Sequence, residues 1–263
     1  GADCGAEKFF NIKCRASGLV PDVAVIVCSI RALKAHSGKF NIVAGKPLDE
    51  GLIKENIPAL EEGICNLEKH IENVKSFGVP AVVAINRFRA DTDKEVEFVK
   101  KKALEFGADG CETSEVWLKG AEGGVDLGRA VIKAAELPKK FNFLYPLNLP
   151  IKEKIRSIAT KIYGAKDVEY SELAEGKIKL FTERKWDNLP ICMAKTHLSL
   201  SHDPTLKGRP RDFVLPIRDI RPSIGAGFLY PLCGTMQTMP GLPSHPAGEK
   251  IDIDEAGNIT GLF

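Results

Sequence analysis

Apolar runs and helical spacings alternate along the first half of the chain. The run VAVIVCSI, from Val23 to Ile30, is rich in β-branched residues and predicts a strand covered on both faces. From about Asp49 to Phe77 apolar residues recur three or four positions apart, which predicts one long amphipathic helix with Gly78 at its C-terminus. The run AVVAIN, from Ala81 to Asn86, predicts a second strand. Strand, helix and strand in this order predict a parallel pair.

The same alternation continues beyond the second strand. The polar run Asp91 to Asp93 can cap a helix from about Lys94 to Phe106. A short strand is expected over CETSEVW, Cys111 to Trp117, followed by the loop KGAEGG and a helix that begins near Val125. Residues 1 to about 140 therefore predict an α/β domain, the C-terminal part of a doubly wound, mostly parallel sheet, preceded by a Gly-rich, loop-like start.

The pattern changes after Leu137 and Pro138. Helices are expected over Ile151–Ala165 and from Ser171 to about Arg184, and strands and turns follow from Pro190 onward. The prolines between Pro204 and Pro240 exclude long helices there. Residues 141–263 therefore predict a smaller α+β domain.

Composition and charge narrow the class of protein. Lys and Arg number 37 against 35 Asp and Glu, so no basic field indicates nucleic acid as a partner. The seven cysteines are scattered without a C-x-x-C pair, which favours free thiols. No apolar run approaches the roughly 20 residues that span a bilayer. We expect a protein of the cytoplasm, with the mitochondrion as an alternative, and neither nucleic acid nor membrane as a partner.

Two aromatic residues follow predicted strands of one sheet, where ligands bind in such folds. Phe88 and Trp117 lie 29 positions apart, and neighbouring strands would bring their rings together around a flat heterocycle. The alternative is that both rings cap the core. Asn86 can offer an amide to a ring edge, or satisfy the loop backbone instead. Thr113 and Arg89 complete this candidate ring-binding site.

Other motifs carry weaker signals. KGAEGG precedes a helix, but no G-x-x-x-x-G-K-[ST] or G-x-G-x-x-G motif occurs in the chain. His197 and His202 flank a polar run without metal spacing, so we expect loop residues. Asp252 and Asp254 predict a solvated hairpin rather than a calcium loop. We expect no metal ligands and no catalytic residue in this chain.

Several longer motifs together resemble one family. These are GADCGAEKFFNIKCRASGL, SIRALKAHSG, VVAINRFRADTD, SEVWLKGAEGG, FLYPLNLPIKEKI, LPICMAKTHLSLSHDP, GRPRDFVLPIRDIRPSIGAGFLYPLCGTMQTMPGLP and the final GLF. In this order they resemble the C-terminal half of formate–tetrahydrofolate ligase. The half that carries the P-loop, and the arginine credited with handling formyl phosphate, precede the matched part.

The resemblance implies a reaction and its ligands. The family joins formate to tetrahydrofolate with ATP and Mg²⁺, through formyl phosphate, and K⁺ or NH₄⁺ assists. The rings at Phe88 and Trp117 would stack on a pterin or adenine, and Phe9 or Phe10 would lie near the nucleotide. The small domain would form a half-barrel sheet that is another wall of the cavity, and the protein would be a homo-oligomer.

Two departures and one alternative accompany the resemblance. Arg89 stands where some members have Pro, and Ala121 replaces a Gly. We expect the chain alone to be inactive without the P-loop half, which would be its partner. The alternative is a non-catalytic folate- or nucleotide-binding or assembly module derived from such an enzyme.

Overall fold

A computed structural model describes residues 2–43, 47–236, 244–255, 257 and 259–261. Gly1, the run 237–243 with Pro240, and the final Leu262 and Phe263 belong to the resembling motifs and lie outside the described residues. Helices and strands of the first 140 residues are α1 (Ala2–Lys8), a π-helical segment (Phe9–Cys14), α2 (Arg15–Ser17), β1 (Ala24–Cys28), α3 (Ile30–Ala35), α4 (Glu50–Ile53), α5 (Ile57–Gly63), α6 (Cys65–Ser76), β2 (Ala81–Asn86), α7 (Asp93–Glu105), β3 (Gly110–Ser114), α8 (Val116–Lys119), a 3-10 segment (Gly120–Gly124) and α9 (Val125–Ala135).

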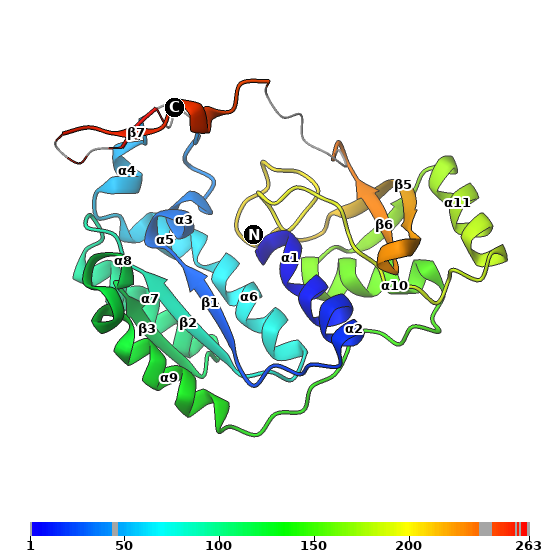
Figure 1. Ribbon diagram of the computed structural model, residues 1–263, viewed down its shortest axis with the longest axis horizontal. Helices are drawn as coiled ribbons and strands as arrows, with labels where there is room; N and C mark the ends of the chain where they lie inside the picture. Colours follow the sequence, from blue (N-terminus) through cyan, green and yellow to red (C-terminus); the bar gives the residue numbers. More distant parts are fainter. Residues whose placement is uncertain (1, 44–46, 237–243, 256, 258, 262–263) are drawn as a thin grey trace.

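A parallel sheet in the order β1-β2-β3 organises this part of the chain (Figure 1). One face carries Val83 and Ile85 of β2, which pack with apolar residues of α3, α5, α6 and α7. On the other face a Cβ at Gly110 would lie 3.4 Å from Ala130 of α9, so this helix packs closely on β3. The predicted parallel pairing of the first two strands is confirmed.

Strand β1 is shorter and more open than its sequence predicts. Ser29 leaves the strand to become the N-cap of α3, where its hydroxyl accepts a hydrogen bond from the amide of Ala32. Val25 and Val27 are 42% and 67% exposed, because α9 packs on β2 and β3 instead. The expectation of a strand covered on both faces is therefore wrong for β1.

The long helix expected from Asp49 to Phe77 is three helices, α4, α5 and α6. Asn56 accepts a hydrogen bond from the amide of Ala59 and begins α5, and Pro58 occupies its first turn, where a missing N–H is tolerated. At the other end of α5, a Cβ at Gly63 would lie 1.8 Å from the carbonyl oxygen of Leu33. The prediction counted apolar spacing and overlooked the cap and the proline.

The predicted boundaries around α7 are confirmed. Thr92 and Glu95 form a capping box, each side chain hydrogen-bonded to the backbone of the other residue.

Gly78 follows α6 with a φ of 71°, and a Cβ there would lie 1.9 Å from the carbonyl oxygen of Lys140. Only glycine fits this turn without rearrangement.

The start of the chain is helical, which corrects the expectation of a loop. Residues 2–17 run through α1, the π-helical segment and α2. Phe10 and Cys14, four positions apart, join the core of the second half of the chain. Asn11 accepts a hydrogen bond from the amide of Leu144, and Tyr163 donates one to Glu7 at 2.5 Å. In Figure 1 this helix lies between α6 and the second sheet. The division of the chain at residue 140 stays a prediction.

The second half of the chain is built around a small mixed sheet. Its elements are α10 (Ile151–Ile158) with a π-helical continuation (Ala159–Tyr163), β4 (Asp167–Tyr170), α11 (Glu172–Glu183), β5 (Val214–Ser223), a 3-10 turn (Ile224–Ala226), β6 (Phe228–Cys233), a 3-10 turn (Ala247–Glu249), β7 (Asp252–Ile253) and β8 (Ile259–Thr260). Strand β5 pairs in parallel with β4 and antiparallel with β6. Both predicted helices are confirmed. The described residues show no barrel.

The structure tests several smaller predictions for the second half of the chain. Residues 191–194, in the part where strands and turns were expected, make two isolated bridges to β6. Strand β4 was not predicted. Asp252 lies in the exposed hairpin β7–β8, as expected. None of the described helices combines the length and the apolar character that crossing a bilayer requires.

Candidate functional site

The candidate site begins where β2 and β3 end. The amide of Arg87 donates to the carbonyl oxygen of Ser114 at 3.2 Å, which continues the strand pairing for one residue. The chain then turns, and the amide of Phe88 donates to the Asp91 carboxylate at 2.8 Å. Asp91 is buried, and burial raises the pKa of its carboxyl group. This turn fixes the backbone that carries Phe88.

Trp117 is placed beside Phe88 by a short helix. The predicted strand Cys111–Trp117 ends at Ser114, and Trp117 lies in α8, which corrects the expected element. Its indole Nε1 donates to the carbonyl oxygen of Arg87 at 2.8 Å. A Cβ at Gly123 would lie 2.6 Å from the Glu115 carbonyl group, so this glycine lets the following 3-10 segment pack against the start of α8.

The two rings face each other in a nearly parallel arrangement. Their centroids are 6.4 Å apart and the planes differ by 29°. A flat ring in van der Waals contact with both would need a gap of about 7 Å, twice the optimal carbon–carbon distance of about 3.5 Å. If the rings overlap face to face, a widening of less than about 1 Å together with removal of the 29° tilt would bring both into contact with a flat ring. Trp117 is 49% exposed, so the indole is accessible from solvent.

A guanidinium group lies over each ring. The Arg31 guanidinium is 5.2 Å from the Phe88 centroid, and that of Arg89 is 5.7 Å from the Trp117 centroid. A cation is attracted to the face of an aromatic ring, and the two guanidinium groups create a positive potential beside Phe88 and Trp117. Arg89 was among the candidates, whereas Arg31 was missed. The available signal was Ser29, a good N-cap, which places Arg31 in the first turn of a helix after β1.

Asn86 and Thr113 lie on opposite faces of the sheet. Asn86 pairs in register with Ser114, and side chains alternate along a strand, so the neighbouring Thr113 points the other way. Asn86 lines a hollow of about 260 Å³ with Ser29 and Asp3. Thr113 lines a separate cavity of about 380 Å³. The structure therefore does not bring these two side chains together.

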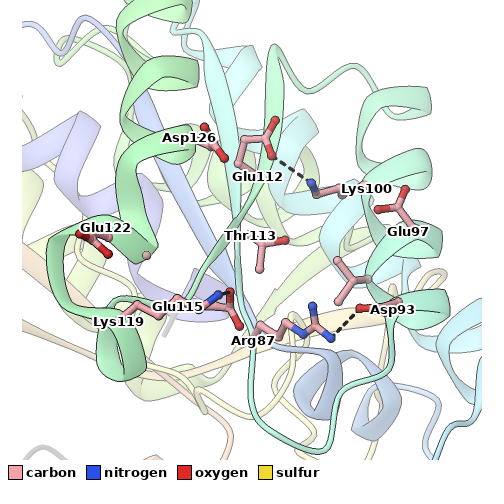
Figure 2. A pocket seen from close by; sticks show the side chains of 12 residues that line it. Arg87, Asp93, Glu97, Lys100, Glu112, Thr113, Glu115, Lys119, Glu122 and Asp126 are labelled. Atoms are coloured by element: carbon pink, nitrogen blue, oxygen red, sulfur yellow. Dashed lines mark hydrogen bonds and ion pairs between the residues drawn. The ribbon is translucent and has the colours of Figure 1, made fainter.

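The cavity beside Thr113 is rich in charges (Figure 2). Its ion pairs are Arg87–Asp93 at 2.7 Å, Lys100–Glu112 at 2.9 Å and Lys119–Glu115 at 2.6 Å. Lys119 lowers the pKa of Glu115 through its hydrogen bond. Among the described residues no group of three or more ligands could hold a metal ion. The pair with Asp93 holds the Arg87 side chain on this side of the strand tip.

Phe9 and Phe10 have different surroundings. Phe10 is buried and stacks on Phe77, with centroids 4.4 Å apart and planes 22° apart. Phe9 is 45% exposed and meets Phe10 edge-on. Of the two, Phe9 is the ring that a ligand can reach in this chain. Whether either contacts a nucleotide stays a prediction.

A polar cluster that the sequence analysis missed lies between α1, α3 and α6. Asp3 accepts a hydrogen bond from Asn66 at 2.9 Å and lies 3.2 Å from His70 and 3.8 Å from His36. Burial alone would raise the pKa of Asp3, but the interactions with His70 and Asn66 lower it to about 2. These residues are far apart in sequence, so no local pattern could reveal the cluster.

The comparisons with known proteins agree over the whole chain. The family model described as Formate--tetrahydrofolate ligase matches residues 1–263. A formate--tetrahydrofolate ligase of Desulforamulus reducens is 58% identical over 263 residues, which are all of this chain and 46% of that protein. The human cytoplasmic C-1-tetrahydrofolate synthase is 52% identical, and the mouse mitochondrial monofunctional C1-tetrahydrofolate synthase is 55% identical. Each match covers this whole chain, and 28% and 27% of those proteins, respectively. The chain thus spans about half the length of its bacterial relative.

Proposed function

Because the chain belongs to the formate–tetrahydrofolate ligase family, we propose that it supplies the ring-binding part of an ATP-dependent ligase that joins formate to tetrahydrofolate. The observation that carries the proposal is the facing pair Phe88 and Trp117 at the carboxyl ends of parallel strands. Sheets of this kind bind ligands at that edge. The pterin of the folate is the planar group that fits between two such rings, and adenine is the second candidate.

The surroundings of the pair favour a polar heterocycle over an apolar one. Arg31 and Arg89 offer several N–H donors close to the rings, and a pterin carries ring nitrogens and a carbonyl oxygen that accept hydrogen bonds. Asn86 and Thr113, one on each side of the strand tip, are proposed to contact the edges or substituents of the ligand. Phe9 is proposed to contact the nucleotide.

The phosphate chemistry is proposed to lie on sequence outside these residues. Transfer of a phosphoryl group to a carboxylate depends on neutralising charge with metal ions and cationic groups. The 263 residues contain no G-x-x-x-x-G-K-[ST] motif. The bacterial relative is about twice as long as this chain, which leaves room for a P-loop half, Mg²⁺ and a monovalent cation. In that arrangement this chain corresponds to the C-terminal half.

The wider organisation follows the same family. We propose that the sheet β4-β5-β6 forms another wall of the cavity, that the parallel sheet belongs to a doubly wound domain, and that the assembled enzyme is a homo-oligomer. The half-barrel form of the smaller sheet stays a prediction. The relatives include a cytoplasmic and a mitochondrial protein, and we propose the cytoplasm as the first compartment to examine.

Two measurements on the 263-residue chain test the proposal. Tetrahydrofolate is expected to quench the fluorescence of Trp117, and ADP release dependent on formate and folate is expected to stay at background. Robust turnover by the chain alone would show that the catalytic groups were misplaced. Absence of any Trp117 response to folate and to ATP would remove the ring-binding role. A P-loop polypeptide that co-purifies with the chain would favour the ligase over an independent binding module.

A further inference from the structure

A third cavity lies at the end of α3, on the side of the second sheet. It has a volume of about 720 Å³. The last residues of α3, the segment 36–42 and the segment 197–207 form its walls. We call it the Lys207 cavity. None of the candidate ring-binding residues lines it.

The walls of the Lys207 cavity are largely apolar. Phe40, Ile42, Leu198 and Pro204 line it, and Ile42 and Leu198 are 52% and 48% exposed. Large apolar side chains left open to water around a concave surface are typical of a ligand site. A flat or apolar body of small-molecule size would cover them.

The charges around the cavity favour an anion at its rim. The Nζ atom of Lys207 donates to the carbonyl oxygen of Leu198 at 3.0 Å, and no ion pair to Lys207 is found within the described part of the chain. Lys39, by contrast, is paired with Glu62 at 2.6 Å. His197 is exposed in the same wall. Lys207 and His197 are therefore available to a carboxylate.

The one carboxylate in the lining is already satisfied. Asp3 interacts with Asn66, His70 and His36, as described above. The His36 Nδ1 atom accepts a hydrogen bond from the amide of Gly208 at 3.2 Å, which holds its ring toward Asp3. The Asp3 carboxylate is thus directed into this cluster, where Asn66 donates a hydrogen bond to it.

Helix α3 connects the ring pair to the Lys207 cavity. Arg31, over Phe88, and Ala35, in the cavity wall, are four positions apart and share one face of the helix. They are separated by about 6 Å along the helix axis. The hollow beside Asn86 shares Asp3, Ala32 and His36 with the cavity, so the two are neighbours.

We propose that the Lys207 cavity binds the p-aminobenzoyl-glutamate arm of the folate whose pterin lies between Phe88 and Trp117. The benzoyl ring packs against Phe40 and Leu198, and a glutamate carboxylate accepts hydrogen bonds from Lys207. This assignment rests on the proposed function and adds the part of the substrate that the ring pair does not reach. It makes Lys207 a determinant of folate affinity.

The test compares two ligands on the 263-residue chain carrying Trp186→Phe, which leaves Trp117 as the single tryptophan. Tetrahydropterin has the ring without the arm, and tetrahydrofolate has both. We expect tetrahydrofolate to bind at least about tenfold more tightly, a difference equivalent to about 1.4 kcal/mol. Lys207→Gln is expected to remove most of this advantage, and Lys207→Arg to keep it. Lys166→Gln, an exposed lysine of the second sheet region, is the matched control and is expected to change nothing.

The outcomes separate the two proposals. Equal affinity for the two ligands, with quenching by both, would overturn the arm site and leave the ring site standing. An advantage of the arm that survives Lys207→Gln would place the arm elsewhere and also overturn the inference. Quenching by neither ligand would remove the ring site, and the arm site with it. A large advantage that depends on Lys207 supports both.

Discussion

Replacement of Trp117 by alanine tests the ring pair most directly. The indole forms one wall of the slot and is half exposed, so its loss removes a contact face without opening the core. Stacking of one ring on a ligand is worth about 0.5–1.5 kcal/mol beyond burial. Removing water from roughly 40 Å² of apolar surface adds about 1 kcal/mol at 25 cal/mol per Å². The expected loss is about 1.5–2.5 kcal/mol, or about 10- to 60-fold in the dissociation constant.

The assay is isothermal titration calorimetry with tetrahydrofolate, because the variant lacks the fluorescent reporter. Trp117→Phe is the matched control, since it keeps a smaller aromatic face and loses the hydrogen bond from Nε1 to the Arg87 carbonyl oxygen. We expect that control to weaken binding about threefold, consistent with one exposed hydrogen bond worth about 0.5–1 kcal/mol. Trp186→Phe, in the second half of the chain beside Phe181, is expected to leave the affinity unchanged.

One result would refute the reasoning. If Trp117→Ala binds tetrahydrofolate within twofold of the parent chain while remaining folded by circular dichroism, the indole contributes no binding face. The facing rings would then be a packing arrangement at the strand tips, which is the alternative that the sequence left open.

Two further predictions concern stability. The pKa of Asp3 is about 2 in the folded chain and about 3.9 in an unfolded one, so its ionised form contributes stability above pH 4 that is lost as the pH falls toward 2. Urea unfolding of the parent chain and of Asp3→Asn should differ by about 2 kcal/mol at pH 6 and converge near pH 2; a difference independent of pH would contradict the assignment. Gly63→Ala would place a Cβ 1.8 Å from the Leu33 carbonyl oxygen and should cost about 3 kcal/mol or more in the free energy of unfolding, whereas Gly128→Ala, in open space on α9, should cost nothing. Equal stability of these two glycine variants would show that α5 can move away from α3.

The sequence predicted the parts of the fold in which local signals agree. The apolar run of β2 is buried along its length, and the polar residues around Thr92 do cap α7. Phe88 and Trp117 were brought together by a topological argument alone, because neighbouring parallel strands end at one edge. That part of the site needed no knowledge of side-chain packing.

The remaining features depend on contacts that sequence spacing does not encode. The N-terminal residues are helical because Phe10 and Asn11 find partners more than sixty positions away. Val27 is exposed although its strand is apolar, because α9 packs on β2 and β3 instead. Arg31 and the Asp3 cluster join the site through tertiary structure. In contrast, Asn56 and Pro58 were readable as a helix start, and apolar periodicity was given too much weight.

The hydrogen bond from Trp117 to the Arg87 carbonyl oxygen joins the two sides of the slot, because the neighbouring residue Phe88 carries the opposite ring. Both walls therefore depend on a single short loop that Asp91 also holds, so the rings face each other before a ligand arrives and only a small adjustment remains. A ligand that binds between such rings loses translational and rotational entropy, but few protein residues become ordered on binding. Differences in affinity between planar ligands should therefore depend on their thickness and on the polar groups at their edges. Closure of the protein around the ligand should contribute little.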